Sequence, residues 1–244
     1  MKSKKVVIST YNFDLSWIEE ILLSNEFLKK DIIIYDKSDH KTDWSKFGTI
    51  LNSKNLGSNV YDMLQYICCN YDNLSDIIIF LKGNILSKSG SLGLEDCPEG
   101  VVEYKINHPI SYYTTKKRLL RALKAEYFLP IERYHPATEL VINGGKFIQK
   151  YWVPPSDLPA HYFSSYEDLA NSLFSNAVCA PIEYQRFCPG ANYVVPKEVI
   201  LKYSINLYEK LKTYCGYGPH WVNAETYFIE RLFYQMWTED LVEL

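Results

Sequence analysis

The segment Asp76–Leu81 (DIIIFL) decides the fold. Its five consecutive apolar residues after an aspartate are typical of a strand at the centre of a parallel sheet, where both faces are covered. The polar turn Lys82-Gly83-Asn84 follows it at once. Two β-branched runs, Lys5–Thr10 (KVVIST) and Asp31–Tyr35 (DIIIY), precede it and are predicted to be strands, and Phe47–Leu51 is a candidate for another.

Helical patterns separate these strands. Asp14–Leu28 and Gly57–Tyr71 both carry apolar residues at helical spacing. Strands that alternate with helices indicate βαβ units with right-handed crossovers, and therefore an α/β fold. Ligands bind such sheets beyond the carboxyl ends of the strands. We therefore expect a functional site where the three strand ends meet, at Thr10-Tyr11-Asn12, Asp36-Lys37-Ser38 and Lys82-Gly83-Asn84.

The second half of the chain is less regular. Its pattern predicts strands, helices and one loop-rich segment, in the order Val101–Ile106 (strand), Thr115–Tyr127 (basic helix), Asn143–Pro159 (loops), Ser164–Phe174 (helix), Gly190–Val195 (strand), Pro196 to about Tyr214 (helix) and Asn223–Trp237 (helix). There is no internal repeat and no low-complexity linker, so we interpret residues 1–244 as a single domain.

The composition excludes several classes of protein. With 26 basic and 29 acidic residues, the chain lacks the basic balance of a duplex-binding domain. Six cysteines without CxxC spacing and five scattered histidines argue against a structural zinc site. No run approaches 18 apolar residues, and the opening MKSKKVVIST has too short an apolar run for a signal peptide. We therefore expect a cytoplasmic protein that does not bind nucleic acid and has neither a structural zinc site nor a transmembrane segment.

Several motifs together resemble a glycosyltransferase-like family of bacteria, fungi and large viruses. They are Tyr11–Trp17 (YNFDLSW), Asn55-Leu56-Gly57, Tyr71–Asp76 (YDNLSD), Phe80–Asn84 (FLKGN), Pro189–Glu198 (PGANYVVPKE) and Glu225–Trp237 (ETYFIERLFYQMW). The resemblance covers most of the chain and is weakest between residues 86 and 180. It implies a GT-A-like fold, with a Rossmann-type mixed sheet flanked by helices and an irregular C-terminal half. Residues 1–100 would bind the nucleotide, and residues 101–244 would hold the acceptor and the catalytic groups.

The resemblance also implies an activity and a set of contacts. The chain would transfer a sugar from a nucleotide-sugar donor to a glycan or lipid-linked saccharide, as in polysaccharide biosynthesis. The residues expected to contact the donor are Thr10, Tyr11, Asn12, Asp36, Lys37, Asn55, Gly57, Asn59, Lys82, Gly83 and Asn84. Trp152 and Asn192 are the candidates for the acceptor.

Two departures from the family pattern bear on the chemistry. Phe13 stands where the family usually has a glutamate, and Lys82-Gly83-Asn84 stands where a metal-dependent GT-A enzyme has Asp-x-Asp. A hard divalent ion on a diphosphate prefers carboxylate oxygens. A lysine can instead place a positive charge on the leaving diphosphate. We therefore expect a metal-independent site, with Mn²⁺ or Mg²⁺ held by other residues as the alternative.

The last predicted helix supplies the candidates for a catalytic base, which an inverting transferase needs to deprotonate the acceptor. Its apolar stripe is formed by Ile229, Leu232, Phe233, Met236 and Trp237. Glu225 precedes Ile229 by four residues and falls on the same stripe in the first turn, whereas Glu230 lies about 100° away. In GT-A enzymes a helix start here contributes the base, so Glu225 is the first candidate and Glu230 the second.

Each assignment has a plain structural alternative. Asn12 could cap a helix, Asp36 could serve a turn, and Lys82 could be an ordinary solvated lysine. Glu225 could stand at the start of the helix only because the helix dipole favours an acid there. Trp152 could serve core packing instead of contacting an acceptor. Two other functions also compete with a transferase. A non-catalytic glycan- or nucleotide-binding module fits the missing Asp-x-Asp, whereas a hydrolase would need a metal or nucleophile constellation that the motifs do not supply.

Overall fold

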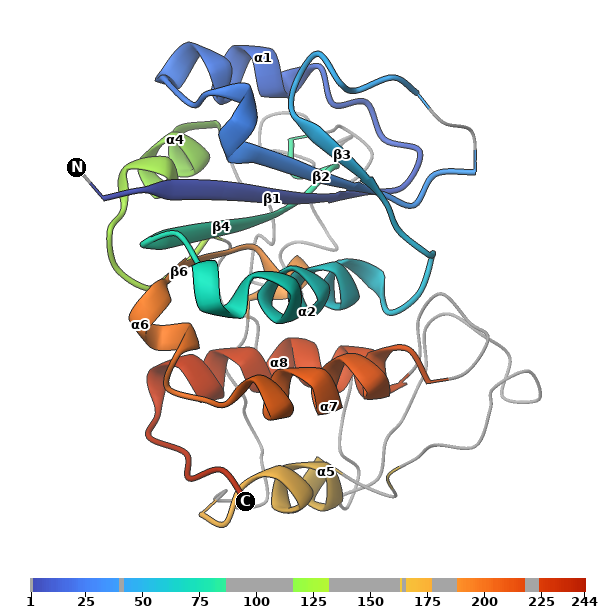
Figure 1. Ribbon diagram of the computed structural model, residues 1–244, viewed down its shortest axis with the longest axis vertical. Coiled ribbons are helices and arrows are strands. Elements are labelled where there is room, and N and C mark those ends of the chain that lie inside the picture. The colour runs from blue at the N-terminus through green and yellow to red at the C-terminus, as the bar shows by residue number, and fades with distance from the viewer. Residues whose placement is uncertain are drawn as a thin grey trace, which may run out of the picture.

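The computed structural model describes residues 2–39, 42–86, 116–131, 163, 166–176, 188–217 and 224–244. A six-stranded mixed sheet lies between helices, with strand order β3-β2-β1-β4-β6-β5 (Figure 1). The strands are β1 (Lys4–Thr10), β2 (Ile32–Asp36), β3 (Thr49–Asn52), β4 (Ile77–Lys82), β5 (Leu129–Pro130) and β6 (Tyr193–Pro196). The helices are α1 (Trp17–Ile21), α2 (Ser58–Asn70), α4 (Lys116–Lys124), α5 (Tyr166–Leu173), α6 (Lys197–Ile200), α7 (Ile205–Cys215) and α8 (Ala224–Thr238).

The centre of the sheet is parallel, as the sequence predicts. β1 pairs in parallel with both β2 and β4, and β3 pairs in parallel with β2. The segment Ile77–Leu81 of β4 is buried along its whole length, which confirms the prediction of a central strand. Because β1, β2 and β4 run in the same direction, their carboxyl ends meet at one edge. β6 is antiparallel to β4, and β5 is antiparallel to β6, so the sheet is mixed.

Helices cover both faces of the sheet. On one face, α1 and α4 bury Ile18, Ile21, Leu119 and Leu123 against the strands. On the other face, α2 packs against the sheet, and α7 and α8 form a further layer behind it (Figure 1). The sheet, α2, α7 and α8 share one continuous apolar cluster. This arrangement leaves the carboxyl-end edge of the parallel strands as the place where turns converge.

The predicted helix Asp14–Leu28 is wrong in length, because α1 ends at Ile21. Two side chains just beyond it bond back to its carbonyls. The Ser24 hydroxyl donates to the carbonyl of Glu19 at 2.9 Å, and the Asn25 amide donates to that of Ile21 at 2.8 Å. Such side-chain bonds offer the backbone an alternative to the helical ladder. The chain then passes through a 3₁₀ turn and turns away at Glu26, whose φ is 69°.

The predicted helix from Pro196 to Tyr214 is interrupted, and α6 and α7 replace it. Ser204 separates them and caps α7, since its hydroxyl oxygen accepts the N–H of Leu207 at 3.3 Å. The carboxylate of Glu243 in turn accepts the backbone N–H of Ser204 at 2.8 Å. A cap of this kind starts a new helix instead of continuing the old one.

The predicted strand Gly190–Val195 begins later than expected, at Tyr193. A tight turn, Pro189–Ala191, takes its first residues. The helices predicted near α4, α5 and α8 are confirmed. The segments Val101–Ile106 and Asn143–Pro159 lie outside the described residues. None of the helices within the described ranges is long and apolar enough to cross a bilayer.

Candidate functional site

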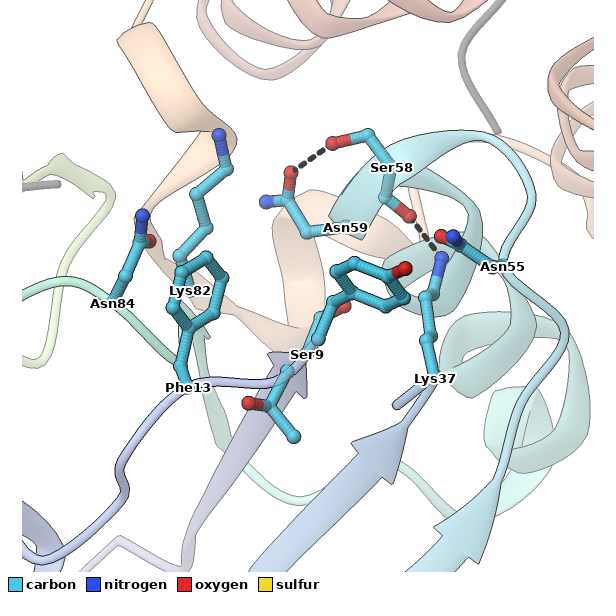
Figure 2. A pocket seen from close by; sticks show the side chains of 10 residues that line it. Ser9, Phe13, Lys37, Asn55, Ser58, Asn59, Lys82 and Asn84 are labelled. Atoms are coloured by element: carbon cyan, nitrogen blue, oxygen red, sulfur yellow. Dashed lines mark hydrogen bonds between the residues drawn. The ribbon is translucent and has the colours of Figure 1, made fainter. Parts of the chain in front are cut away.

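A pocket of about 340 Å³ opens at the carboxyl ends of β1, β2 and β4 (Figure 2). It is lined by Ser9, Thr10, Tyr11, Phe13, Lys37, Asn55, Ser58, Asn59, Lys82 and Asn84. The strand ends therefore meet around one hollow, where the sequence analysis expects a site. Seven residues expected to contact a donor are in this lining, namely Thr10, Tyr11, Lys37, Asn55, Asn59, Lys82 and Asn84.

Lys82 is the last residue of β4 and is only partly buried. Its backbone N–H donates to the side-chain oxygen of Asn192 at 2.7 Å, which fixes the end of the strand. Its side chain extends between those of Asn59 and Asn84 (Figure 2). No residue in the described part of the chain forms an ion pair or hydrogen bond with its ammonium. Lys82 therefore brings to the pocket a positive charge that no described residue neutralises.

The ammonium of Lys37, by contrast, is bound by groups of the protein itself. It donates to the carbonyl oxygens of Leu56, at 2.7 Å, and Ser58, and lies 3.2 Å from Oδ2 of Asp62. The side chains of Lys37 and Asp62 are 3% and 1% exposed. Because an ammonium has three N–H donors, these contacts use all of them. Lys37 thus shapes the pocket wall and holds the turn before α2.

Asp62 completes this buried ion pair and was missed by the sequence analysis. The hydroxyls of Ser9 and Ser53 donate to its two carboxylate oxygens, that of Ser53 at 2.6 Å. Burial raises the pKa of Asp62 and lowers the pKa of Lys37, while the attraction between the two charges opposes both shifts. The sequence does contain a sign of this pair. An aspartate on the inward face of a predicted helix needs a buried partner, and a lysine at the end of a preceding strand can supply it.

The turn Asn55–Asn59 forms one wall of the pocket and leads into α2. Its backbone is left-handed at both Gly57 (φ 56°) and Ser58 (φ 53°). Gly57 lies against α7, where an added Cβ would be 2.9 Å from the carbonyl oxygen of Cys215. The side-chain amide of Asn59 donates to the carbonyl of Gly190 at 2.6 Å. Gly57 therefore sets the backbone of the wall without lining the pocket itself.

The loop after β1 supplies the aromatic wall, Tyr11 and Phe13, and is bonded to the loop after β2. The Tyr11 hydroxyl donates to Oδ2 of Asp39 at 2.6 Å. The backbone N–H of Asn12 (φ 55°) donates to the Ser38 hydroxyl at 2.7 Å. The carboxylate of Asp36, 1% exposed, accepts the N–H of Ser38 at 2.9 Å. Neither Asn12 nor Asp36 lines the pocket. The bonds of Tyr11 to Asp39 and of Asn12 to Ser38 tie the two loops together, whereas the carboxylate of Asp36 holds the loop after β2 in shape.

Gly83 and Asn192 support the end of β4 from outside the pocket lining. Gly83 accepts the indole N–H of Trp17 at 2.8 Å, and a Cβ on it would lie 2.6 Å from Oγ1 of Thr10. Asn192 is 1% exposed, and its side-chain oxygen accepts the backbone N–H of Lys82. Trp152, the other acceptor candidate, lies outside the described residues.

The two candidate bases lie on α8. Glu225 is 1% exposed, and the stripe of Ile229, Leu232, Phe233, Met236 and Trp237 is buried with it, which confirms the predicted inward face. Glu230 accepts the backbone N–H of Gly190 at 2.6 Å. Neither glutamate is among the lining residues. Within the described ranges there is also no group of three or more His, Cys, Asp or Glu side chains that could hold a metal ion.

Within the part of the chain that the structure describes, the site therefore combines the unpaired ammonium of Lys82 with several side-chain amides and hydroxyls and two aromatic rings. Comparisons of the chain with models of protein families, with curated proteins and with solved structures find no match to any of them.

Proposed function

We propose that this chain is a glycosyltransferase of GT-A-like architecture that binds a nucleotide-sugar donor in the pocket at the strand ends. The observation that carries the proposal is the ammonium of Lys82, which faces a hollow at the carboxyl end of a central parallel strand without a partner among the described residues. Phosphate oxygens are natural partners for such a charge. The position is also where open α/β sheets bind their ligands.

The other lining groups suit the rest of such a donor. The side-chain amides of Asn55, Asn59 and Asn84 can hydrogen-bond hydroxyl groups of a ribose or a sugar. The rings of Tyr11 and Phe13 offer apolar area for a flat nucleobase or a sugar face. Lys82 would stabilise the charge that develops on the leaving phosphate, in the role that a metal plays elsewhere. Mn²⁺ or Mg²⁺ is not needed in this scheme.

If transfer inverts the anomeric centre, it also needs a base for the acceptor hydroxyl, which would belong to a glycan or a lipid-linked saccharide. We assign this role first to Glu225, because it lies in the first turn of α8, where the resemblance places the base. Glu230, which accepts the N–H of Gly190, is the second candidate. The donor would then lie at the strand ends, and the acceptor would lie between the donor and α8.

A thermal-shift screen tests donor binding. Nucleotide sugars and free nucleotides would each be measured with EDTA and with Mn²⁺. Ligand at 100 times its Kd should stabilise the fold by about 2.7 kcal/mol, which raises Tm by several degrees. A shift with one nucleotide family that survives EDTA is the expected result. A shift that needs Mn²⁺ would contradict the metal-free scheme, and no shift with any donor would contradict the proposal.

Lys82→Ala is expected to weaken binding of that nucleotide in EDTA by about 10–100-fold, the usual value of a hydrogen bond to a charged group. The fold should be unaffected, since the bond to Asn192 uses the backbone of Lys82. Isothermal titration calorimetry measures the affinity. Lys210→Ala removes an exposed lysine of α7 and is the matched control. Equal affinities in the two variants would show that Lys82 does not contact the ligand.

One observation favours a second candidate function, a non-catalytic nucleotide- or glycan-binding module. None of the ten described residues that line the pocket carries a carboxylate. A transfer assay with a panel of saccharide acceptors separates the two. Release of nucleotide from a bound donor supports the transferase, whereas tight donor binding with no transfer to any acceptor and no donor hydrolysis supports the module.

A further inference from the structure

We infer that Glu230 is a positioning residue, which holds the pocket in shape through the turn Pro189–Ala191 and does not take part in proton transfer. The inference deepens the proposed function and depends on it only for one of its two readouts. Its basis is a chain of hydrogen bonds that links α8 to two walls of the pocket.

The turn Pro189–Ala191 has an unfavourable backbone. Gly190 has φ 77°, and the next residue, Ala191, has φ 49°, in the left-handed region that a residue with a Cβ rarely adopts. Such conformations persist only where the surrounding structure over-determines them. The contacts of the turn therefore indicate what keeps it in place.

Two helices clamp Gly190 from opposite sides of its backbone. Oε1 of Glu230, on α8, accepts the N–H of Gly190 at 2.6 Å. The side-chain amide of Asn59, on α2, donates to the carbonyl oxygen of Gly190, also at 2.6 Å. The first of these is charge-assisted, and bonds to an ionised acceptor are about twice as strong as neutral ones.

The clamped turn reaches the pocket at two points. Asn59 is itself a lining residue, so its bond to Gly190 fixes the direction of an amide at the pocket wall. Asn192, two residues beyond Gly190, holds the backbone N–H of Lys82 at 2.7 Å. If the turn moves, the hydrogen bonds that hold the side chain of Asn59 and the backbone of Lys82 in position are weakened. The carboxylate of Glu230 therefore acts on the pocket from outside it.

A pair of substitutions separates positioning from catalysis. Glu230→Gln keeps an oxygen that can accept the N–H of Gly190 but cannot serve as a base, whereas Glu230→Ala keeps neither property. A positioning role predicts that the glutamine variant resembles the wild type. A role as base predicts that both variants lose transfer while both bind the donor normally.

Hydrogen exchange of the Gly190 amide, followed by NMR without any ligand, is the first readout. In Glu230→Ala the amide should exchange about tenfold faster or more, because the bond that protects it is gone, and in Glu230→Gln about threefold faster at most. The second readout is the affinity for the nucleotide identified by the thermal-shift screen. It should fall about tenfold in Glu230→Ala and stay within about threefold of the wild type in Glu230→Gln.

Glu209→Ala, an exposed glutamate of α7, is the control for loss of an acid, and Tm values verify that every variant folds. Unchanged exchange of Gly190 in the alanine variant overturns the inference, as does a glutamine variant that loses protection equally. Loss of transfer in the glutamine variant at normal donor affinity also overturns it. A wild type that binds no nucleotide contradicts the proposed function, while the exchange readout still decides the role of Glu230.

Discussion

Lys37→Met should lower the free energy of unfolding by about 3–5 kcal/mol, the usual cost of breaking a buried ion pair from one side. The substitution leaves the carboxylate of Asp62 buried, with the two serine hydroxyls as its remaining partners among the described residues. It also removes the donor from the carbonyls of Leu56 and Ser58, in the turn before α2. Urea unfolding at pH 7.5 measures the loss.

The loss should shrink as the pH falls. Burial raises the pKa of Asp62, and Lys37 supplies the attraction that opposes this shift, so the variant raises that pKa further. A carboxyl group whose pKa is higher in the folded state than in the unfolded state binds more protons when folded. Its favourable contribution is complete below the unfolded pKa, near 3.8, and is lost as the pH rises through the folded pKa. Unfolding at pH 5 should therefore show a smaller deficit than at pH 7.5.

Two further variants complete this test. Lys37→Met combined with Asp62→Asn should be more stable than Lys37→Met alone, because no uncompensated charge remains and the asparagine oxygen still accepts from a serine. Lys54→Met, at an exposed lysine of the adjacent turn, should change stability by about 0.5 kcal/mol or less. Equal deficits at both pH values, or a double variant no better than the single one, would show that the buried charge is not the cause.

Gly57→Ala is expected to cost about 2–5 kcal/mol, as the sum of a left-handed backbone and an overpacked contact. The φ of Gly57 is 56°, and an added Cβ would meet Cβ of Tyr61 at 2.8 Å and the carbonyl oxygen of Cys215 at 2.9 Å. These are backbone or backbone-adjacent atoms, so they cannot swing away as the end of a long side chain can. The wall Asn55–Asn59 and α7 would have to separate, and both stability and nucleotide affinity should fall.

Gly216→Ala is the matched control, one residue beyond Cys215. The φ of Gly216 is −88°, and the nearest atom to its added Cβ would be 3.4 Å away. Alanine fits this conformation, so the change in the free energy of unfolding should stay within about 1 kcal/mol. Urea unfolding of both variants provides the comparison. Similar losses at positions 57 and 216 would argue against a steric role for Gly57.

The sequence predicts β1, β2 and β4 well because their signal is local and strong, whereas it misses β5 and begins β6 three residues early. A continuous apolar run such as Ile77–Leu81 strongly favours a buried strand. In the same way, the helical spacing of apolar residues in α8 favours a buried helix face. The end of α1 is different. The apolar spacing continues past Ile21, but hydrogen bonds from Ser24 and Asn25 to the last carbonyls decide the boundary. The spacing of apolar residues does not show that these side-chain bonds replace the backbone bonds of a longer helix.

The site is predicted in position but not in its interactions. Parallel strands bring their ends together by geometry, so the pocket lies where the strand-end rule expects it. The pairing of Lys37 with Asp62 depends on how α2 lies across the sheet, and a spacing of residues does not specify that docking. The burial of Glu225 follows from helical periodicity, whereas its place outside the pocket lining depends on the position of α8 behind α2.

The mixed sheet has a consequence for the order of folding. β4 pairs with β6 from Ile77↔Pro196 to Phe80↔Tyr193, across more than a hundred intervening residues. During synthesis β4 is therefore an apolar edge strand until the C-terminal half emerges, and such an edge invites pairing with another chain. Contacts this distant in sequence also raise the contact order, which slows folding. In the finished sheet the hazard is gone, because its outer strands, β3 and β5, are only four and two residues long.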